Sequence, residues 1–118
     1  MYFKNNGYIV TSIDPIKEFC KYGKSIGLDN VIQMSIEDID YNNEFDAIWA
    51  CASLLHLKSN QLVDVFNKCY KALKDNGVMY VSFINIINQT NFKIDKLWIN
   101  SQDRLNRDVK WLNVLLEK

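Results

Sequence analysis

The sequence predicts an α/β fold: a mainly parallel sheet flanked by helices, with an antiparallel hairpin at its C-terminal end. Three observations support this prediction. Short runs rich in β-branched residues alternate with two stretches of helical periodicity. The run Ala47–Ala52 is apolar throughout, as expected of a strand buried on both faces. Two late apolar runs are separated only by a short polar stretch, which is typical of a hairpin.

The strands and helices are expected in the order strand, helix, strand, strand, helix, strand, and then two strands. Strands are predicted over 8–13, 31–34, 46–50, 78–83, 94–99 and 110–116, where β-branched and aromatic residues concentrate. The Asn-rich stretch 84–92 and the polar stretch 100–108 are predicted to be loops. Because strands and helices alternate over most of the chain, the sheet should be mainly parallel.

The first helix is predicted to begin at Asp14, as its N-cap, with Pro15 at the first helical position. Gly27 is expected to end it. One face of this helix gathers apolar and small residues at helical spacing, namely Ile16, Phe19, Cys20, Gly23 and Ile26. We therefore expect this face to pack against the sheet.

The second helix is predicted to run from Ser59, as its N-cap, to about Lys74. Its apolar stripe is formed by Leu62, Phe66, Tyr70 and Leu73. Asn76 and Gly77 provide the expected stop signal before the next strand. In the two late strands, Trp98 and Trp111 are expected to lie in the core or to cover the sheet.

Composition limits the classes of function. The 118 residues, 48% of them hydrophobic, suit one domain over 1–118 with a modest core. Basic and acidic residues balance at 14 each, so no basic excess exists to neutralise nucleic-acid phosphates. No apolar run reaches transmembrane length, and three cysteines without metal-ligand spacing or a signal peptide predict reduced thiols in the cytoplasm. We expect no nucleic-acid partner, no membrane contact and no metal site.

The most informative motif is E-F-D-A-I-W-A-C-A-S-L-L-H-L at Glu44–Leu57. A strand that starts with F-D-x-I and opens into an S-L-L-H loop resembles the corresponding motif of class I S-adenosylmethionine-dependent methyltransferases. Further segments match that family in order: I-V-T-S-I-D ending at Asp14, V-I-Q-M-S-I-E-D-I at 31–39, A-L-K-D-N-G-V-M-Y-V-S-F at 72–83, and W-L-N-V at 111–114. The chain thus resembles a Rossmann-like methyltransferase domain over most of its length.

This resemblance implies S-adenosyl-L-methionine as the cofactor, bound beyond the carboxyl ends of the parallel strands. Asp14 would accept hydrogen bonds from the ribose hydroxyls, and the same carboxylate also suits a helix N-cap. Ser35 and the amide of Ile36 would contact the adenine, with the side chain of Ile36 covering its face. The alternative interpretation is a plain strand end and turn, in which Glu37 and Asp38 are solvated.

The resemblance also implies which residues would face the reaction. Ala50 and Cys51, at a strand end, would lie against the methionine part of the cofactor, where small side chains allow close approach. The only histidine, His56, would act as a general base. The alternatives are a loop residue that caps the next helix and a satisfied packing residue. Ser53 would bind the substrate or cap a turn. Asp46, at the start of a strand, is expected to be structural and to pair with a backbone or basic group.

The implied reaction is methyl transfer to an unidentified acceptor, expected to be a small molecule. The departure from the family is the lack of its first strand and of the G-x-G-x-G turn that follows it. By the family's strand order this strand belongs between 8–13 and 46–50. Its absence leaves two sheet halves with unpaired inner edges, on the order of 1–3 kcal/mol per buried unpaired group.

We therefore expect a truncated domain that closes its sheet within the monomer, through a homo-oligomer or with a strand-donating partner chain, or that stays loose. The alternative is a catalytically inactive remnant, or an interaction domain that completes its sheet with a partner. Two other α/β classes fit less well. A nicotinamide-dependent fold needs the same glycine turn, and a phospho-receiver domain needs an acidic pair where I-V-T-S-I-D supplies one acid.

Overall fold

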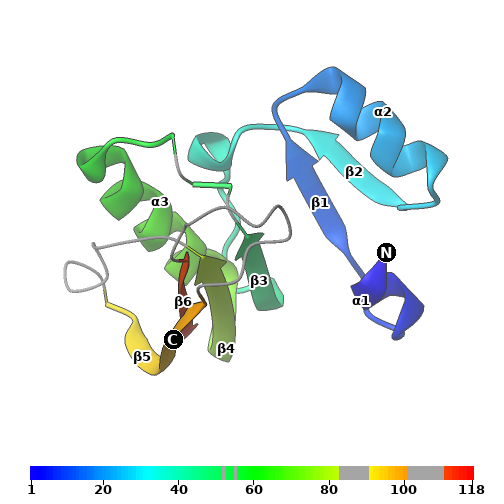
Figure 1. Cartoon of the computed structure of the whole chain (residues 1–118). Coiled ribbons are helices and arrows are strands. Elements are labelled where there is room, and N and C mark those ends of the chain that lie inside the picture. The colour runs from blue at the N-terminus through cyan, green and yellow to red at the C-terminus, as the bar shows by residue number, and fades with distance from the viewer. Residues whose placement is uncertain (52, 55, 83–90, 101–110) are drawn as a thin grey trace. The chain divides into compact units, whose positions relative to one another are not determined.

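The computed structural model describes residues 1–51, 53, 54, 56–82, 91–100 and 111–118. The chain forms two compact units, Met1–Ile39 and Asp40–Lys118. Figure 1 labels their elements, which are α1 (Tyr2–Asn5), β1 (Thr11–Asp14), α2 (Lys17–Ser25), β2 (Asn30–Gln33), the 3₁₀ helix η1 (Ile36–Asp38), β3 (Phe45–Cys51), α3 (Ser59–Ala72), β4 (Leu73–Ser82), β5 (Lys93–Asn100) and β6 (Trp111–Glu117).

The first unit is built on two parallel strands. β1 pairs with β2 from Thr11↔Asn30 to Asp14↔Gln33, and α2 packs alongside them (Figure 1). The buried residues of α2 are Cys20 and Gly23. The rest of the predicted apolar face is not buried: the exposed fractions of Ile16, Phe19 and Ile26 are 47%, 60% and 37%. A sheet of two strands is too narrow to cover the whole apolar face of a helix.

The start of α2 corrects a prediction. Asp14 is the last residue of β1 and not the N-cap, which is Ile16. The carboxylate of Asp14 instead accepts a hydrogen bond from the N–H of Ile16, 2.8 Å away, two residues along the chain. This Asx-type turn redirects the backbone from strand to helix and leaves Pro15 outside the helix. The short helix α1 was not predicted at all.

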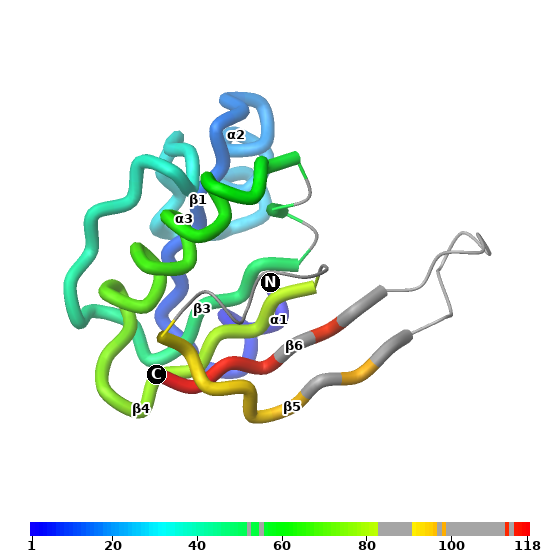
Figure 2. Tube along the Cα trace, turned by 90° about the vertical axis from the view of Figure 1, so that its left-hand side faces the viewer, coloured from blue at the N-terminus to red at the C-terminus, as the bar shows by residue number. Residues whose placement is uncertain are grey.

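The second unit holds a four-stranded sheet in the order β3-β4-β6-β5, whose strands run side by side in Figure 2. β3 and β4 are parallel, whereas β6 is antiparallel to both of its neighbours. The predicted antiparallel hairpin of β5 and β6 is therefore confirmed. Residues 84–90 and 101–108, most of the two predicted loops, lie outside the described residues.

Helix α3 packs against one face of this sheet. Its predicted stripe is confirmed at Leu62 and Phe66, which are buried. On the sheet, Met79, Val81 and Leu116 are fully buried. Aromatic residues follow the opposite face: Trp49 stacks on Tyr80 with ring centroids 3.9 Å apart, and Trp98 lies 6.0 Å from Tyr80. Trp98 thus covers the sheet, as predicted, but is 44% exposed, and the side chain of Trp111 is not among those described.

Both ends of α3 differ from the prediction. Lys58, and not Ser59, is the N-cap, and the side-chain oxygen of Gln61 accepts a hydrogen bond from the N–H of Lys58 at 3.0 Å. The helix ends at Ala72, and β4 begins at the next residue. The Asn76–Gly77 pair lies inside β4, where the pairing with β3 shifts register, rather than at the helix end.

The two sheets agree with the predicted strand order. In the described part of the chain, β1 pairs only with β2, and β3 pairs only with β4. β1 and β3 are the two strands between which the family's first strand was expected. The fold class is confirmed: an α/β chain of parallel strands flanked by helices, with an antiparallel end.

Candidate functional site

The first group of predicted site residues gathers at the carboxyl ends of β1 and β2. Asp14 ends β1 opposite Gln33 of β2. The carbonyl oxygen of Asp14 accepts a hydrogen bond from the N–H of Met34 at 3.1 Å, which fixes the segment that leads into Ser35. Parallel strands place their carboxyl ends at one edge, the usual position of ligands in such sheets. The structure thus brings Asp14 and the Ser35–Ile36 segment together.

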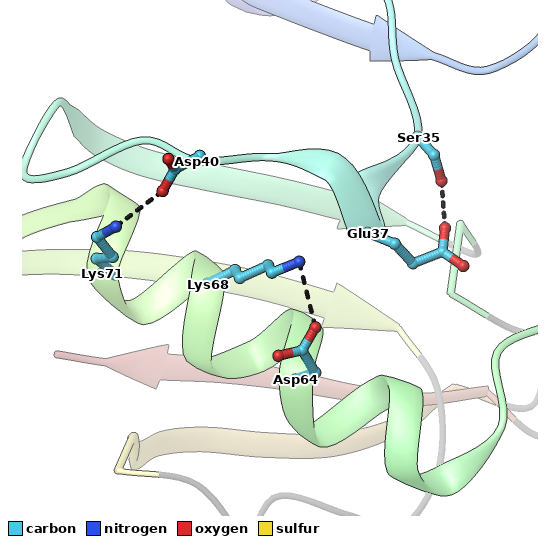
Figure 3. Close-up of polar contacts among 6 residues, drawn as sticks. All are labelled: Ser35, Glu37, Asp40, Asp64, Lys68 and Lys71. Atoms are coloured by element: carbon cyan, nitrogen blue, oxygen red, sulfur yellow. Dashed lines mark hydrogen bonds and ion pairs between the residues drawn. The ribbon is translucent and has the colours of Figure 1, made fainter.

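Ser35 and Ile36 lie at the beginning of η1. Ser35 is the N-cap of this 3₁₀ turn, and its hydroxyl donates a hydrogen bond to the carboxylate of Glu37 (Figure 3). Ile36 is the first helical residue, and the first N–H groups of a helix have no acceptor within it. Glu37, which the alternative interpretation leaves solvated, is half-buried and accepts the hydrogen bond from Ser35. Its spacing of two residues from Ser35 was the available signal.

The second group lies at the carboxyl end of β3. Ala50 is buried and Cys51, the last residue of the strand, is exposed. Cys51 pairs in register with Ser82, the last residue of β4, whose hydroxyl lies 3.5 Å from the Cys51 sulfur. Ser82 is buried and was missed by the sequence analysis. Its position, at the end of an apolar strand run, was the signal that could have identified it.

Electrostatics near this strand end affect one tyrosine. Burial raises the pKa of the Tyr80 hydroxyl, and the neighbouring Cys51 thiol adds to the rise when charged. The Tyr80 hydroxyl donates a hydrogen bond to the side-chain oxygen of Asn113 at 2.6 Å. Asp46 is structural, as predicted: the ammonium of Lys74 lies 3.0 Å from its carboxylate.

Ser53 and His56 lie in the loop after β3. Two buried residues fix this loop, because the N–H of Leu57 bonds the carbonyl of Leu54 at 3.2 Å and both side chains point into the core. Ser53 and His56 are exposed. The prediction that His56 caps α3 is wrong, since the cap is Lys58. Within the described part of the chain, no hydrogen bond or ion pair involves the imidazole of His56.

Two exposed ion pairs of the second unit involve lysines of α3 (Figure 3). Lys71 of α3 pairs with Asp40 at 2.8 Å, and this hydrogen bond holds the pKa of the Asp40 carboxyl below its usual range. Lys68 pairs with Asp64 one helical turn away, at 3.2 Å. These exposed pairs are structural, and exposed pairs of this kind contribute little to stability.

The described residues offer no candidate metal centre or membrane span. No three of their His, Cys, Asp or Glu side chains converge as metal ligands, and none of their helices is long and apolar enough to cross a membrane. The first unit has an open hollow of about 260 Å³ beside Lys4, Gly7, Tyr8 and Asn30. None of the predicted site residues lines it.

Comparison with known families decides the affiliation. A family model described as a methyltransferase domain matches residues 1–81. The chain belongs to this family. The match includes both strand ends described above, with Asp14, Ser35 and Ile36 in one unit and Ala50 and Cys51 in the other. No curated protein sequence matches the methyltransferase-domain chain.

Solved methyltransferases share its fold. A 1,6-didemethyltoxoflavin-N1-methyltransferase from Burkholderia thailandensis, solved with S-adenosylhomocysteine, aligns with a TM-score of 0.83 at 14% identity. A Methanosarcina mazei SAM-dependent methyltransferase gives 0.85 at 13%. Both alignments cover 99% of this chain, but 64% and 85% of the other proteins. An N-methyltransferase from Bradyrhizobium japonicum with S-adenosylhomocysteine gives 0.73 at 14%, covering 91% and 65%. At such identities the likeness establishes the Rossmann-like methyltransferase fold.

Proposed function

We propose that this chain binds S-adenosyl-L-methionine and transfers its methyl group to a small-molecule acceptor. The family match and the fold support methyltransferase chemistry. The observation that carries the proposal is the gathering of Asp14, Ser35 and Ile36 at the carboxyl ends of β1 and β2.

Asp14 is assigned to the ribose. One oxygen of its carboxylate accepts the N–H of Ile16 at 2.8 Å. A carboxylate offers about four acceptor sites on its two oxygens. The hydrogen bond to Ile16 therefore fixes the side chain and leaves acceptor capacity for two vicinal hydroxyls. A residue without a carboxylate would lose both the fixed geometry and the charge-assisted hydrogen bonds.

Ser35, Glu37 and Ile36 are assigned to the adenine. The Ser35 hydroxyl donates its hydrogen to the Glu37 carboxylate, so its oxygen lone pairs stay available to accept from the adenine amino group. The carboxylate of Glu37 lies beside the same position and brings an acid next to Ser35. The amide of Ile36, at the first position of η1, would donate to the ring, and its side chain would cover the adenine face.

The methionine part and the acceptor are assigned to the second unit. Ala50 and Cys51 are small and leave room at the end of β3. S-adenosylmethionine supplies a methyl group on a sulfonium, which a nucleophile of the acceptor displaces in line. Catalysis of this kind depends mainly on proximity and orientation. Where the nucleophile carries a proton, the exposed imidazole of His56 accepts it, and Ser53 hydrogen-bonds the acceptor.

The acceptor class rests on one comparison and on the charge balance of the chain. The structurally similar Burkholderia thailandensis protein was solved with bound 1,6-didemethyltoxoflavin, a small molecule, and S-adenosylhomocysteine. This chain has equal numbers of acidic and basic residues, which gives it no excess charge for a polyanionic acceptor. Both points support a small, uncharged or weakly charged acceptor.

Calorimetric titration with S-adenosylhomocysteine, the demethylated product, tests the proposal. We expect saturable binding by the wild-type chain and a loss of about tenfold or more in affinity for Asp14→Ala, because two charge-assisted hydrogen bonds disappear. Asp14→Asn keeps an acceptor for the Ile16 amide and should show an intermediate affinity. Glu18→Ala, which removes an acid from the first turn of α2, is the matched control and should bind like the wild type.

The outcome that would reject the proposal is equally direct. The proposal is rejected if the chain is folded by circular dichroism but shows no heat of binding with S-adenosylhomocysteine at the highest concentrations that calorimetry can use. Equal affinities of the wild-type chain and Asp14→Ala would show that binding occurs elsewhere.

A further inference from the structure

The turn Asp14–Ile16, which connects β1 to α2, is held by side chains from two other parts of the first unit. Its first residue carries the carboxylate assigned above to the ribose. Cys20 of α2 places its sulfur 3.3 Å from the carbonyl oxygen of Asp14. Gln33, the last residue of β2, donates a side-chain N–H to the carbonyl oxygen of Pro15 at 3.2 Å. Neither Cys20 nor Gln33 was predicted to belong to the site.

The thiol of Cys20 is a buried donor with an acceptor within reach. The residue is 6% exposed, so its thiol hydrogen needs an acceptor inside the protein. The carbonyl oxygen of Asp14 is the nearer of two acceptors, since that of Ile32 lies 3.7 Å away. The oxygen of Asp14 also accepts the N–H of Met34 at 3.1 Å. A carbonyl oxygen has two lone pairs, so two donors from different elements fix the orientation of this peptide group.

Gln33 holds the next peptide group of the turn. Asp14 and Gln33 are partners in register at the ends of β1 and β2. The amide of Gln33 bonds the carbonyl of Pro15, whose ring already restricts its φ to a narrow range. The N–H of Ile16, in the peptide group that contains this carbonyl, then bonds the Asp14 carboxylate at 2.8 Å. The donor that orients the carboxylate is thus itself held from β2.

We propose that Cys20 and Gln33 are positioning residues, which hold the turn so that the carboxylate of Asp14 faces the ribose hydroxyls. This inference rests on the proposed cofactor binding and deepens it. Each of the two side chains acts through a carbonyl oxygen of the turn and not through a contact with the cofactor. A carboxylate that is already oriented loses less conformational entropy on binding, so its hydrogen bonds contribute more to affinity.

The positioning role can be distinguished from a contribution to packing. α2 buries only Cys20 and Gly23, so the loss of the sulfur atom also leaves a small cavity and lowers stability. A loss of stability weakens cofactor binding whether or not residue 14 has a carboxylate. A loss of positioning weakens it only where the carboxylate of Asp14 is present. A double-mutant cycle with Asp14 therefore separates the two effects.

Calorimetric titration of the full chain with S-adenosylhomocysteine is the test. Cys20→Ala removes the thiol donor and Gln33→Met the amide donor, and each should lower the affinity about threefold or more. Cys20→Ser keeps a donor and should bind within about twofold of the wild type. In the Asp14→Ala background, neither Cys20→Ala nor Gln33→Met should weaken binding further. Cys69→Ala makes the same chemical change at a buried cysteine of α3, and this matched control should bind like the wild type.

The outcomes separate this inference from the proposed function. No binding by the wild-type chain, or equal affinities of the wild type and Asp14→Ala, rejects the ribose assignment and the positioning role with it. If Asp14→Ala binds weakly but Cys20→Ala or Gln33→Met binds like the wild type, the positioning role of that residue alone is rejected. Equal losses in both backgrounds, or no recovery in Cys20→Ser, assign Cys20 to packing. If Cys20→Ala does not fold, Gln33→Met decides, because Gln33 is exposed and its replacement leaves the core intact.

Discussion

Two cysteines of the second unit lie in opposite environments, and this difference predicts a pH effect. Cys69 of α3 is fully buried, and burial raises the pKa of its thiol from 9.0 to about 12. Unfolding exposes the thiol, which then ionises above pH 9 while the folded chain keeps it protonated. The unfolded state therefore binds fewer protons between pH 9 and 12. The contribution of Cys69 to stability is complete below pH 9 and is lost as the pH rises through this range.

The measurement is urea unfolding at several pH values for the wild type and for Cys69→Ala. The free energy of unfolding of the wild type should fall more steeply above pH 9, by at most about 1.4 kcal/mol per pH unit. Cys51→Ala, which changes an exposed thiol, is the control and should keep the steeper slope. Parallel curves for the wild type and Cys69→Ala would contradict the burial effect.

At single residues, sequence reasoning succeeded where a local rule decides the outcome. Asp46 begins a strand far from its carboxyl end, and the structure pairs it with Lys74 as predicted. Asp14 ends β1 as predicted, but its hydrogen bond goes to Ile16, so it forms a turn and not a cap. The contact between Ser35 and Glu37 was missed because the two-residue spacing, although visible in the sequence, does not by itself fix the side-chain rotamers.

At the scale of the elements, the first part of β4 leaves no room for a side chain at Gly77. The pairing of β4 with β3 shifts from Phe45↔Leu73 to Ala47↔Val78, so the intervening residues bulge out. Asn76 there has a φ of 63°. A Cβ added at Gly77 would lie 2.8 Å from the backbone oxygen of Lys74, so the backbone there would have to shift.

We expect Gly77→Ala to destabilise the chain by about 1–3 kcal/mol, the usual cost of overpacking a fixed site. Asn76→Gly is the matched control, because glycine adopts positive φ freely and should be neutral or slightly stabilising. Both are measured by urea unfolding with the wild type alongside. A Gly77→Ala variant as stable as the wild type would show that the bulge relaxes at little cost.

Periodicity predicted the central parts of the helices and strands correctly, but it did not predict where they begin and end. The stripe of α3 is buried at Leu62 and Phe66 as predicted, since helical spacing determines which residues share a face. The helix ends at Ala72, before the predicted end, because β4 starts directly at Leu73. Strand pairing, a tertiary contact, decided this boundary over the local Asn76–Gly77 signal. The apolar face of α2 was overestimated for a similar reason, since only two strands are present to cover it.

At the scale of the whole chain, strand order was predictable through the family resemblance and not through periodicity. Alternating strands and helices indicate a parallel sheet, but they do not say which strands are neighbours. The resemblance supplied the order and thus the two separate sheets, which the structure has.

The distribution of buried residues predicts that the two units differ in local stability. Of the buried apolar residues in the described part of the chain, only Cys20 and Ile39 belong to Met1–Ile39, and the others lie in Asp40–Lys118. A two-stranded sheet with one helix is marginal by itself, because little apolar area offsets its conformational entropy. The amides of β1 and β2 should therefore open more readily than those of α3 and β4.

Native-state hydrogen exchange measures this difference. We expect amides of β1 and β2 to exchange at least about tenfold faster than those of α3, a difference of about 1.4 kcal/mol in opening free energy. If the proposed cofactor site is correct, S-adenosylhomocysteine should slow exchange at Asp14 and from Ser35 to Asp38, because a ligand that binds only the ordered state stabilises it by mass action. The amides of β5 serve as the internal control and should exchange at the same rate with and without the ligand. Exchange of both units in step would mean that the chain opens as one cooperative whole, so that the small core of the first unit does not limit its stability.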